Sequence, residues 1–377
     1  MTGNYDAIVI GTGGMGAAAA RHLARRGARV LGLDRFPPPH DRGSSHGHTR
    51  LIRTAYYEHP DYVPLLLRAR AAWRELEAET GRRLLFDSGV VMAGPEGCEL
   101  IRGSCLAAEI HGLAVERLTA GEAAGRWPAL RLPETWPVVF EAAAGHLLVE
   151  DCVRGYLDAA MRAGADLRFG VTVHGWRESG NGVVVETDAG SFTAGRLVLC
   201  PGPWAAGLLR LPDAPLTVLR KSLFWFEPAE RAIHEPAALP CFACDTPAGF
   251  FYGFPALDER GVKLAEHSGG GPVADPLAVD RGIDPGERRA IETFRDAHLP
   301  RLGGRLAAHA TCLYTMTPDH HFLLGLHPHH PQVAIAAGFS GHGFKFASVV
   351  GEILADLATT GRTPHPIAFL APGRFTG

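Results

Sequence analysis

A glycine-rich turn near the N-terminus constrains the fold of this chain more than any other feature. Its sequence is Gly11-Thr12-Gly13-Gly14-Met15-Gly16. It follows a strand-like apolar run, Asp6 to Ile10, and precedes an alanine-rich stretch that predicts a helix to about Arg26. Gly11, Gly13 and Gly16 match the positions that allow a tight turn, close approach of a pyrophosphate and close packing of helix on strand. The pattern predicts a dinucleotide-binding βαβ unit.

The next strand-like run, Arg29 to Asp34, ends in a carboxylate about 20 residues after the glycines. A carboxylate at this place accepts hydrogen bonds from the ribose hydroxyls of a dinucleotide. Asp34 therefore supports the interpretation of the glycine turn. The motif by itself does not distinguish FAD from NAD.

Composition and charge exclude several classes of protein. The chain has 377 residues, of which 46% are hydrophobic, and 37 lysines and arginines against 40 acids give a formal charge of -3 at pH 7. This balance offers no electrostatic footprint for nucleic acid or for an anionic membrane. No apolar run approaches the roughly 20 residues that span a bilayer, and no signal-like segment precedes the first strand. We expect a cytoplasmic protein with neither a nucleic-acid nor a membrane partner.

Cysteines and histidines offer two alternative sites, and both are disfavoured. The seven cysteines are odd in number and scattered, which indicates reduced thiols, and the pair Cys241 and Cys244 has no second pair to make a metal site. A group of histidines is interrupted by Pro328 and Pro331, which break any regular facial spacing. Its members are His320, His321, His327, His329 and His330. We expect no metal, and we interpret the cysteine pair as structural.

The pattern of elements changes twice along the chain. Alternating, aromatic stretches between about Leu216 and Ala310 predict an antiparallel sheet layer with one helix near Pro285 to His298. α/β character returns with a strand at Val333 to Ala337, a glycine-rich loop at 338–343 and a helix at Phe346 to Thr359. Further expected elements are a helix from Tyr62 to about Gly81, a capping box of Thr119 with Glu122, and strands at Arg196 to Cys200, Ser222 to Phe226, Phe250 to Phe254 and Val262 to His267.

We therefore expect an α/β protein of two interleaved domains. A doubly wound, glutathione-reductase-like cofactor domain takes residues 1–80, 145–215 and 320–377. A mixed, largely antiparallel-sheet substrate domain takes residues 81–144 and 216–319.

A basic loop, Arg42 to Tyr56, follows the ribose-binding strand. Arg50 and Arg53 are separated by two apolar residues, so the segment is expected to be partly buried and its guanidinium groups to need anionic partners. The alternative is a solvated basic loop. We favour a role in ligand binding.

Two further stretches carry a resemblance to a known family. They are Cys312-Leu313-Tyr314-Thr315 and Gly338-Phe339-Ser340-Gly341-His342-Gly343-Phe344-Lys345-Phe346. With Ser45-His46-Gly47 they resemble the monomeric sarcosine oxidase and N-methyltryptophan oxidase family, close to the sarcosine/pipecolate oxidases, within the D-amino-acid oxidase superfamily. The resemblance extends over nearly the whole chain.

The resemblance implies FAD as the cofactor, attached through its 8α carbon to the thiol of Cys312. An electron-poor flavin ring is open to attack by a thiolate, although a lone buried cysteine is more often inert. The cofactor-binding residues that it implies, together with those of the fingerprint, are Gly11, Gly13, Gly16, Asp34, Ser44, Ser45, His46, Arg50, Val173, Gly202, Trp204, Cys312, Gly338, Gly341, Gly343, Phe344 and Lys345.

The resemblance also implies the substrate site. Arg53 and Lys345 match the pair that clamps a substrate carboxylate, and Tyr314 joins them in binding. The implied catalytic residues are Lys263, His267, Arg50 and Tyr252. Lys263 matches a lysine whose charge stabilises the anion forming from oxygen, the alternative being a solvent-facing strand lysine.

The implied function is oxidation of the C–N bond of a small secondary or cyclic amino acid by a monomeric enzyme, with oxygen reduced to hydrogen peroxide. The alternatives are a flavin dehydrogenase that passes electrons to another acceptor and a non-catalytic redox sensor. The chain departs from the usual His-His-Gly-Asp-Thr-Arg of bacterial sarcosine oxidases at Ser45 and His48, and it has Tyr57 where glycine is common. These departures leave the side chain of the amine open.

Overall fold

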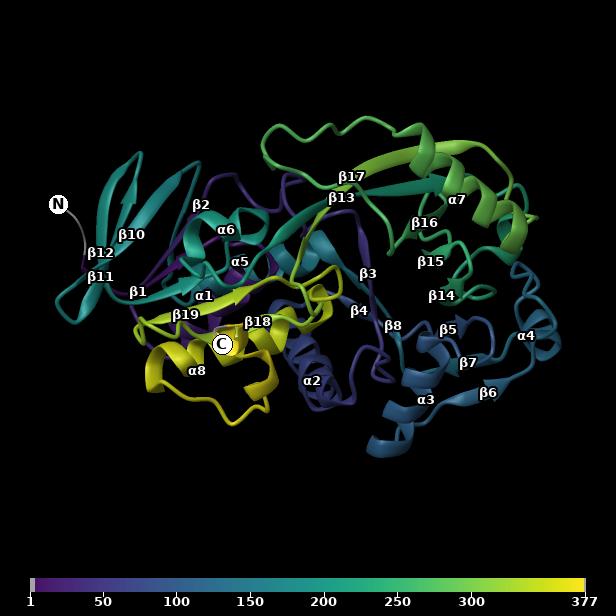
Figure 1. Cartoon of the computed structure of the whole chain (residues 1–377), viewed down its shortest axis with the longest axis horizontal. Coiled ribbons are helices and arrows are strands. Elements are labelled where there is room, and N and C mark those ends of the chain that lie inside the picture. Colours follow the sequence, from purple (N-terminus) through teal and green to yellow (C-terminus); the bar gives the residue numbers. More distant parts are fainter. Residues whose placement is uncertain (1–3, 376–377) are drawn as a thin grey trace.

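Two eight-stranded β-sheets and one three-stranded sheet frame the part of the chain that the computed structural model describes, residues 4–375. In Figure 1 the first large sheet lies on the left, the second on the right, and the small sheet between them. The small sheet joins β3 (Thr49–Ile52), β8 (Gly145–Leu148) and β4 (Leu85–Phe86). The basic loop predicted to bind a ligand thus enters the region between the two large sheets.

The first large sheet is parallel at its centre and is called the cofactor sheet below. Its parallel strands are β1 (Asn4–Ile10), β2 (Val30–Asp34), β9 (Asp166–Phe169), β12 (Gly190–Leu199) and β19 (Val333–Ala337). Antiparallel additions are β10 (Val173–Ser179), β11 (Gly182–Thr187) and β18 (Leu323–Leu326).

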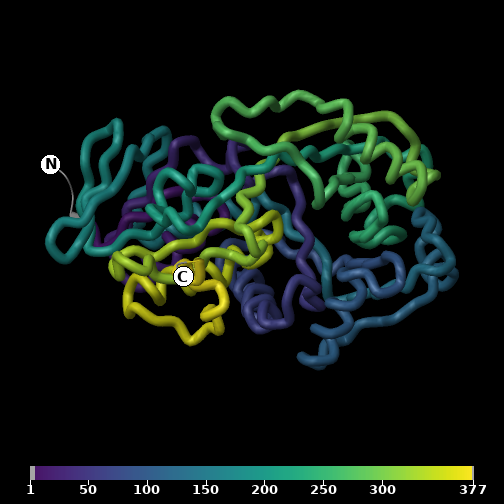
Figure 2. The backbone as a smooth tube through the Cα atoms, viewed as in Figure 1, coloured from purple at the N-terminus to yellow at the C-terminus, as the bar shows by residue number. Residues whose placement is uncertain are grey.

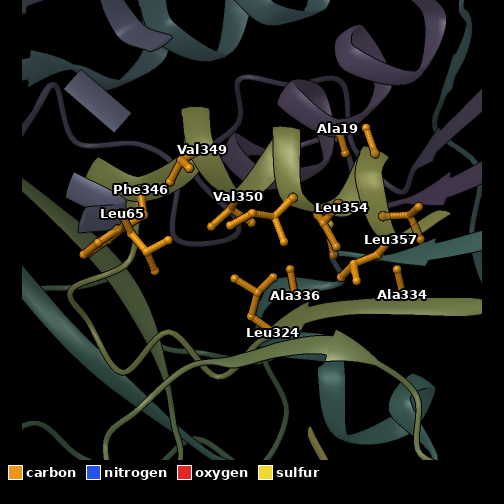
Figure 3. Packing of buried hydrophobic residues seen from close by; sticks show 14 of the residues in the cluster. Ala19, Leu65, Leu324, Ala334, Ala336, Phe346, Val349, Val350, Leu354 and Leu357 are labelled. Carbon is orange, nitrogen blue, oxygen red and sulfur yellow. The ribbon is translucent and has the colours of Figure 1, made fainter. Parts of the chain in front are cut away.

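Helices cover one face of the cofactor sheet. α1 (Gly14–Arg25) and α8 (Ala347–Thr360) pack on its strands, α5 (Val149–Arg162) packs on α1, and α2 (Val63–Thr80) packs on α8 and α5. Along β1, Ala7 and Val9 pack toward this helical side, while Ile8 and Ile10 pack into the core on the opposite face. Figure 3 shows apolar residues of α8, among them Val350 and Leu354, above Leu324, Ala334 and Ala336 of β18 and β19. The opposite core includes residues of β10, β11 and the short helix α6 (Ala205–Leu209).

The second large sheet is called the substrate sheet below. Its strand order is β17 (Leu306–Met316), β13 (Thr217–Phe226), β16 (Val262–Glu266), β15 (Gly249–Phe254), β14 (Cys241–Thr246), β5 (Val90–Ala93), β7 (Val138–Glu141) and β6 (Glu116–Leu118). Every neighbouring pair is antiparallel except β14 with β5.

An apolar core lies on each face of the substrate sheet. One includes Phe224, Phe226 and Phe251 and is covered by α7 (Pro285–His298). The other includes Tyr252 and Tyr314, together with residues of α3 (Glu99–His111). The remaining helices are α4 (Ala120–Arg126) and the short 3₁₀ turns η1 (Pro60–Tyr62), η2 (Gly202–Trp204), η3 (Arg231–Ile233), η4 (Phe344–Phe346), η5 (Ala368–Leu370) and η6 (Pro372–Phe375).

The expected elements are confirmed, most with small shifts at their ends; β12 and β13 are longer than expected and begin at Gly190 and Thr217 instead of Arg196 and Ser222. α7 and β19 have the expected bounds, and α2 ends before Gly81, whose φ of 68° lies in the left-handed region. Both hydrogen bonds of the capping box of Thr119 with Glu122 are present. β16 ends at Glu266, so that His267, expected on the strand, is the first residue of the following loop.

All strands of the cofactor sheet fall within 1–80, 145–215 and 320–377, and all strands of the substrate sheet fall within 81–144 and 216–319. Figure 2 shows the chain crossing between the two regions more than once: its purple, teal and yellow parts lie on one side, its blue and green parts on the other. The division into two domains at these boundaries stays a prediction. Among residues 4–375, no helix is long and apolar enough to cross a membrane.

Candidate active site

A cavity of about 350 Å³ opens at the carboxyl ends of the parallel strands. Strands β1, β2, β12 and β19 run the same way, so the turns that follow them meet at one edge of the sheet. The cavity is lined by these turns, by the loop at 43–45 and by residues 313–315 of β17. It thus lies where the cofactor sheet meets the substrate sheet.

Two glycines of the fingerprint are required by close backbone approach. Gly11 has a φ of 83°, and a Cβ there would lie 2.3 Å from the carbonyl oxygen of Cys200. A Cβ on Gly16 would lie 1.8 Å from the carbonyl oxygen of Gly11. The turn therefore brings the amino end of α1 to the cavity wall, where Gly13 and Gly14 line it. Helix N-termini favour anionic groups such as pyrophosphate.

Asp34 is held at the end of β2 with its carboxylate at the cavity. Its Oδ2 accepts the backbone N–H of Thr12 at 2.7 Å, and its Oδ1 accepts that of Phe36 at 3.1 Å. Oδ2 also accepts the hydroxyl of Thr12 at 3.2 Å, so Oδ1, which accepts one of these three hydrogen bonds, is the oxygen that retains capacity for a ribose hydroxyl. Asp34 lines the cavity.

Unpartnered polar atoms indicate that the cavity fits a large polar ligand. Trp204 Nε1 and Thr315 Oγ1 are buried at the cavity wall and have no hydrogen-bond partner within residues 4–375. Buried polar groups are nearly always paired. A dinucleotide running along the cavity would supply partners, so the residues present fit FAD.

Cys312 lies beside Arg50, behind the wall of the cavity. Arg50, which lines the cavity, donates from Nη2 to Cys312 Sγ at 3.3 Å and to Ser44 O at 3.0 Å. Burial acts to raise the pKa of Cys312, but Arg50 and His46 outweigh it, and the pKa is lowered to about 7. Burial raises the pKa of the other buried thiols, Cys152, Cys200, Cys241 and Cys244. Cys312 is therefore set apart by thiolate character.

Lys263 is buried against the turn that leads into β3, residues 47–49. Its Nζ donates to Gly47 O at 2.6 Å, to Thr49 O at 3.0 Å and to Thr49 Oγ1 at 3.2 Å. Burial and the charge of Arg50 lower the pKa of Lys263 well below its ordinary value. Three acceptors match the three N–H donors of an ammonium, which favours the charged form. Because all three N–H donors are occupied, the ammonium can act on a neighbouring group through its charge and not through a further hydrogen bond.

Arg53 is enclosed on three sides. Its Nη2 lies 2.9 Å from both carboxylate oxygens of Glu58, and its guanidinium carbon lies 4.5 Å and 4.6 Å from the ring centroids of Tyr56 and Tyr57. Tyr57 also stacks on Phe250, with ring centroids 5.5 Å apart. A buried guanidinium thus already has an anionic partner in this structure.

Lys345, on η4, contacts Tyr56 as Arg53 does. Its Nζ donates to His342 O at 2.7 Å and to Tyr56 Oη at 3.4 Å, and Tyr56 Oη lies 2.6 Å from His342 Nδ1. Burial, followed by the charge of Arg53, lowers the pKa of Lys345 to about 7. The two predicted clamp cations therefore both lie against the ring of Tyr56.

His267 continues an aromatic row toward the cavity. Its ring centroid lies 5.4 Å from that of Phe250 and 5.6 Å from that of Tyr314, and Tyr314 lines the cavity. Burial and then His342 lower the pKa of His267 to about 3, so the imidazole is neutral at ordinary pH. Tyr252 is buried in the same core as Tyr314.

The predicted cofactor residues separate into two groups. Those that line the cavity are Gly11, Gly13, Asp34, Ser44, Ser45, Arg50, Val173, Gly202, Trp204, Gly338, Gly341, Gly343 and Phe344. Gly16, His46, Cys312 and Lys345 lie outside the lining. Gly16 packs on Gly11, behind the turn. The roles of all these residues, and of the substrate residues, stay predictions.

Sequence reasoning missed Glu58 and Glu150. Glu58 pairs with Arg53, and the need of a buried guanidinium for an anion was a signal for an acid nearby. Glu150 accepts the backbone N–H groups of Gly47 and His48, and thereby holds the turn that binds Lys263. His48, one of the departures from the family, has a φ of 70° in this turn.

The residues of the two disfavoured sites can also be placed in the structure. Within residues 4–375, no three histidine, cysteine or carboxylate side chains gather in a way that could hold a metal ion. Cys241 and Cys244 belong to the cores on opposite faces of the substrate sheet, and both are free thiols. They point away from each other along β14.

Sequence comparison agrees with the cavity and its glycine turn. The chain matches the FAD dependent oxidoreductase family over residues 6–357 and belongs to it. It is 43% identical to a monomeric sarcosine oxidase of Streptomyces avermitilis, over 99% of this chain and 98% of that one. It is 38% identical to an N-methyl-L-tryptophan oxidase of Salmonella agona, over 96% of each chain.

Solved structures share the fold. NikD, described as an unusual amino acid oxidase essential for nikkomycin biosynthesis, superposes with a TM-score of 0.87 at 28% identity, over 98% of each chain. A glycine oxidase from Geobacillus kaustophilus superposes with a TM-score of 0.83 at 23% identity, over 99% of each chain, and shows the fold alone. The expected family and fold class are confirmed: the chain is a flavin-dependent oxidoreductase.

Proposed function

We propose that this enzyme oxidises the C–N bond of a small secondary or cyclic amino acid and passes the electrons to oxygen. The observation that carries the proposal is the pair of buried cations, Arg53 and Lys345, that meet at Tyr56 beside the cofactor cavity. Buried cations suit a carboxylate ligand. The names of the relatives, sarcosine oxidase and N-methyl-L-tryptophan oxidase, support a substrate with an N-methyl amino acid unit.

FAD, when bound, supplies the acceptor for the two electrons and returns them to oxygen. Oxidation removes two electrons and two protons from the CH–NH unit and yields an imine, which water can hydrolyse. Oxygen takes up the same two electrons and two protons and becomes hydrogen peroxide.

The residues that would hold FAD are those of the cavity wall. Gly13 and Gly14 would receive the pyrophosphate, and Asp34 the ribose. We further propose that Cys312 bonds covalently to the flavin: its sulfur would replace one hydrogen of the 8α carbon, the two electrons and two protons released would be taken up by the flavin, and oxygen would remove them as hydrogen peroxide. A pKa of about 7, held down by Arg50 and His46 against burial, supports this role because the thiolate is the nucleophile.

Substrate binding would exploit the groups around Tyr56. The carboxylate would lie between Arg53 and Lys345, in competition with Glu58 for Arg53. The aromatic row of Tyr57, Phe250 and His267 would exclude water from the reacting carbon. The neutral imidazole of His267 adds no charge that would repel a secondary amine.

Lys263 supports an oxidase rather than a dehydrogenase. Its ammonium is fixed by Gly47 O and Thr49 O, close to Arg50 and Cys312. A fixed positive charge stabilises the anion that develops when oxygen accepts an electron. We also propose that the enzyme is a monomer, as the name of the sarcosine oxidase relatives says of them.

The test is a panel of N-methyl and cyclic amino acids, with matched amines that lack a carboxylate. Peroxide release and dye reduction are measured in parallel. An oxidase forms peroxide with the carboxylate-bearing members. Dye reduction without peroxide would identify a dehydrogenase, and absence of both, with flavin bound, would favour a sensor.

A further inference from the structure

The chain contains only three lysines among its 37 lysines and arginines: Lys221, Lys263 and Lys345. All three are buried, with exposed fractions of 4%, 1% and 6%. Lysine is ordinarily among the most exposed residue types. Here every other basic position is arginine, so a lysine occurs only where it is buried. Lys263 and Lys345 belong to the proposed site, whereas Lys221 has no role in the function described above.

Lys221 lies on the active face of the substrate sheet. On β13 it is paired with Cys312 of β17, and Leu219 with Tyr314, so these residues share a face. The Nζ of Lys221 lies 5.1 Å from the ring centroid of Tyr314. A third buried ammonium is therefore present on the face that carries the proposed flavin-binding cysteine.

The ammonium of Lys221 is enclosed by the loop that follows β16. It donates to His267 O at 2.7 Å, to Ser268 O at 2.8 Å and also to Gly269 O. Three consecutive carbonyls converging on one point suit a compact ammonium with three donors, whereas a planar guanidinium spreads its donors apart. The backbone of Gly270 passes close to the side chain of Lys221: a Cβ at Gly270 would lie 3.1 Å from Lys221 Cε.

His267 depends on this arrangement for its place. β16 ends at Glu266, and the backbone of His267 is held by its N–H to Phe250 O at 2.7 Å and by Lys221 at its carbonyl. Its ring then lies against Phe250 and Tyr314.

We propose that Lys221 is a positioning residue for the substrate pocket: it closes the 267–269 loop and thereby holds the His267 ring against Tyr314. The proposal rests on the proposed function, since it assigns His267 to the substrate. A lysine suits this position because one ammonium ties together the carbonyls of three consecutive residues, 267–269, in a loop that is itself only partly buried.

The alternative is that Lys221 only anchors the loop and has no effect through His267. In that case, loosening the loop at its other end should have the same effect on the substrate pocket. The far end of the same loop is held by Arg281, which donates to Asp41 O at 2.7 Å and to Thr311 O at 3.2 Å. Arg281→Met is therefore a matched control that loosens the loop away from His267.

The experiment compares Lys221→Met, His267→Asn, the double variant and Arg281→Met as holoenzymes. Steady-state kinetics use the best N-methyl amino acid of the panel, and flavin absorbance gives the Kd of cyclopentanecarboxylate, a probe that needs no turnover. A 1 Å misplacement of a contact costs up to about 100-fold in rate. We expect Lys221→Met to raise KM and the probe Kd by about tenfold or more, with a smaller change in kcat.

In the double variant, the effect of Lys221→Met should vanish, because it acts through His267. Equal effects of Lys221→Met with and without His267, an unchanged KM and Kd, or the same loss in Arg281→Met would each overturn the proposal. If Lys221→Met does not yield folded holoenzyme, Lys221→Gln takes its place. If the wild type oxidises no amine, the proposed function fails, while the probe Kd still decides the role of Lys221.

Discussion

Arg50 Nη2 lies 3.3 Å from the thiol of Cys312, although the two residues are 262 positions apart in the sequence. Arg50 reaches this place from β3 and Cys312 from β17, so the contact joins the small sheet to the substrate sheet. It supplies the positive charge that opposes the effect of burial on the pKa of the thiol. The proposed covalent bond to flavin depends on this relationship.

Cys312→Ser should abolish covalent flavin. After acid precipitation, the wild-type pellet should remain yellow and the variant pellet should be colourless, with its flavin in the supernatant. Cys241→Ser is the control, because that thiol is equally buried and its pKa is raised to about 12. Acid-stable flavin in Cys312→Ser would contradict the assignment.

Arg50→Met should slow covalent attachment most at neutral pH. Attachment needs the thiolate, and the pKa of Cys312 is about 7 with Arg50 present, so the wild-type rate should rise through about pH 7 and level off above it. Without the guanidinium the midpoint should move upward by roughly one to three pH units. Acid-stable flavin is followed over time after apoprotein is mixed with FAD. Arg50→Lys, which keeps the charge, should shift the midpoint less; an unshifted midpoint in Arg50→Met would remove Arg50 from this role.

Lys263→Met should slow reoxidation by oxygen and spare reduction by substrate. Loss of one electrostatic stabiliser typically costs about 100-fold to 1000-fold. Stopped-flow absorbance measures the two half-reactions separately. The result must be compared with Glu150→Gln, since Glu150 holds the turn whose carbonyls bind Lys263 and should give a smaller loss in the same half-reaction. Reoxidation at the wild-type rate would leave Lys263 as an ordinary buried lysine.

Carboxylate binding should weaken as pH rises through about 7. The pKa of Lys345 is lowered to about 7, chiefly by burial, so its ammonium is lost above that pH and the affinity for an anion should fall by up to about tenfold per pH unit. Titration of cyclopentanecarboxylate against flavin absorbance at several pH values gives the profile. Lys345→Met should bind weakly at all pH values without this dependence. Carbon-13 NMR of lysine labelled at Cε provides the pKa directly, because the chain has only three lysines to resolve.

Glu58→Gln should tighten carboxylate binding by about tenfold, because it removes the anion that occupies Arg53. The matched control is Glu79→Gln, which breaks an ion pair with Arg21 and Arg25. Equilibrium titration with the same probe measures both. A higher Kd in Glu58→Gln would show that Glu58 orients Arg53 for the substrate instead of competing with the substrate carboxylate.

The sequence by itself determined the class of fold and predicted part of the lining of the cofactor cavity. The contact of Gly16 with Gly11 and the end of β2 at Asp34 are local features of one βαβ unit, so a pattern of residue types predicts them. The helix bounds were equally predictable where caps are local, as with Thr119 and Gly81. The family resemblance added which residues to examine.

Only the tertiary structure decided how those residues act on one another. The low pKa of Cys312, the Glu58 partner of Arg53 and the carbonyls around Lys221 depend on distances between side chains and backbone groups that folding brings together. Electrostatic and hydrogen-bond energies depend on separation in space and on burial, and residue type and local spacing specify neither for groups on different sheets. This is why the sequence named Arg50 and Cys312 separately, and why their contact, with the reactivity it confers, was apparent only in the folded chain.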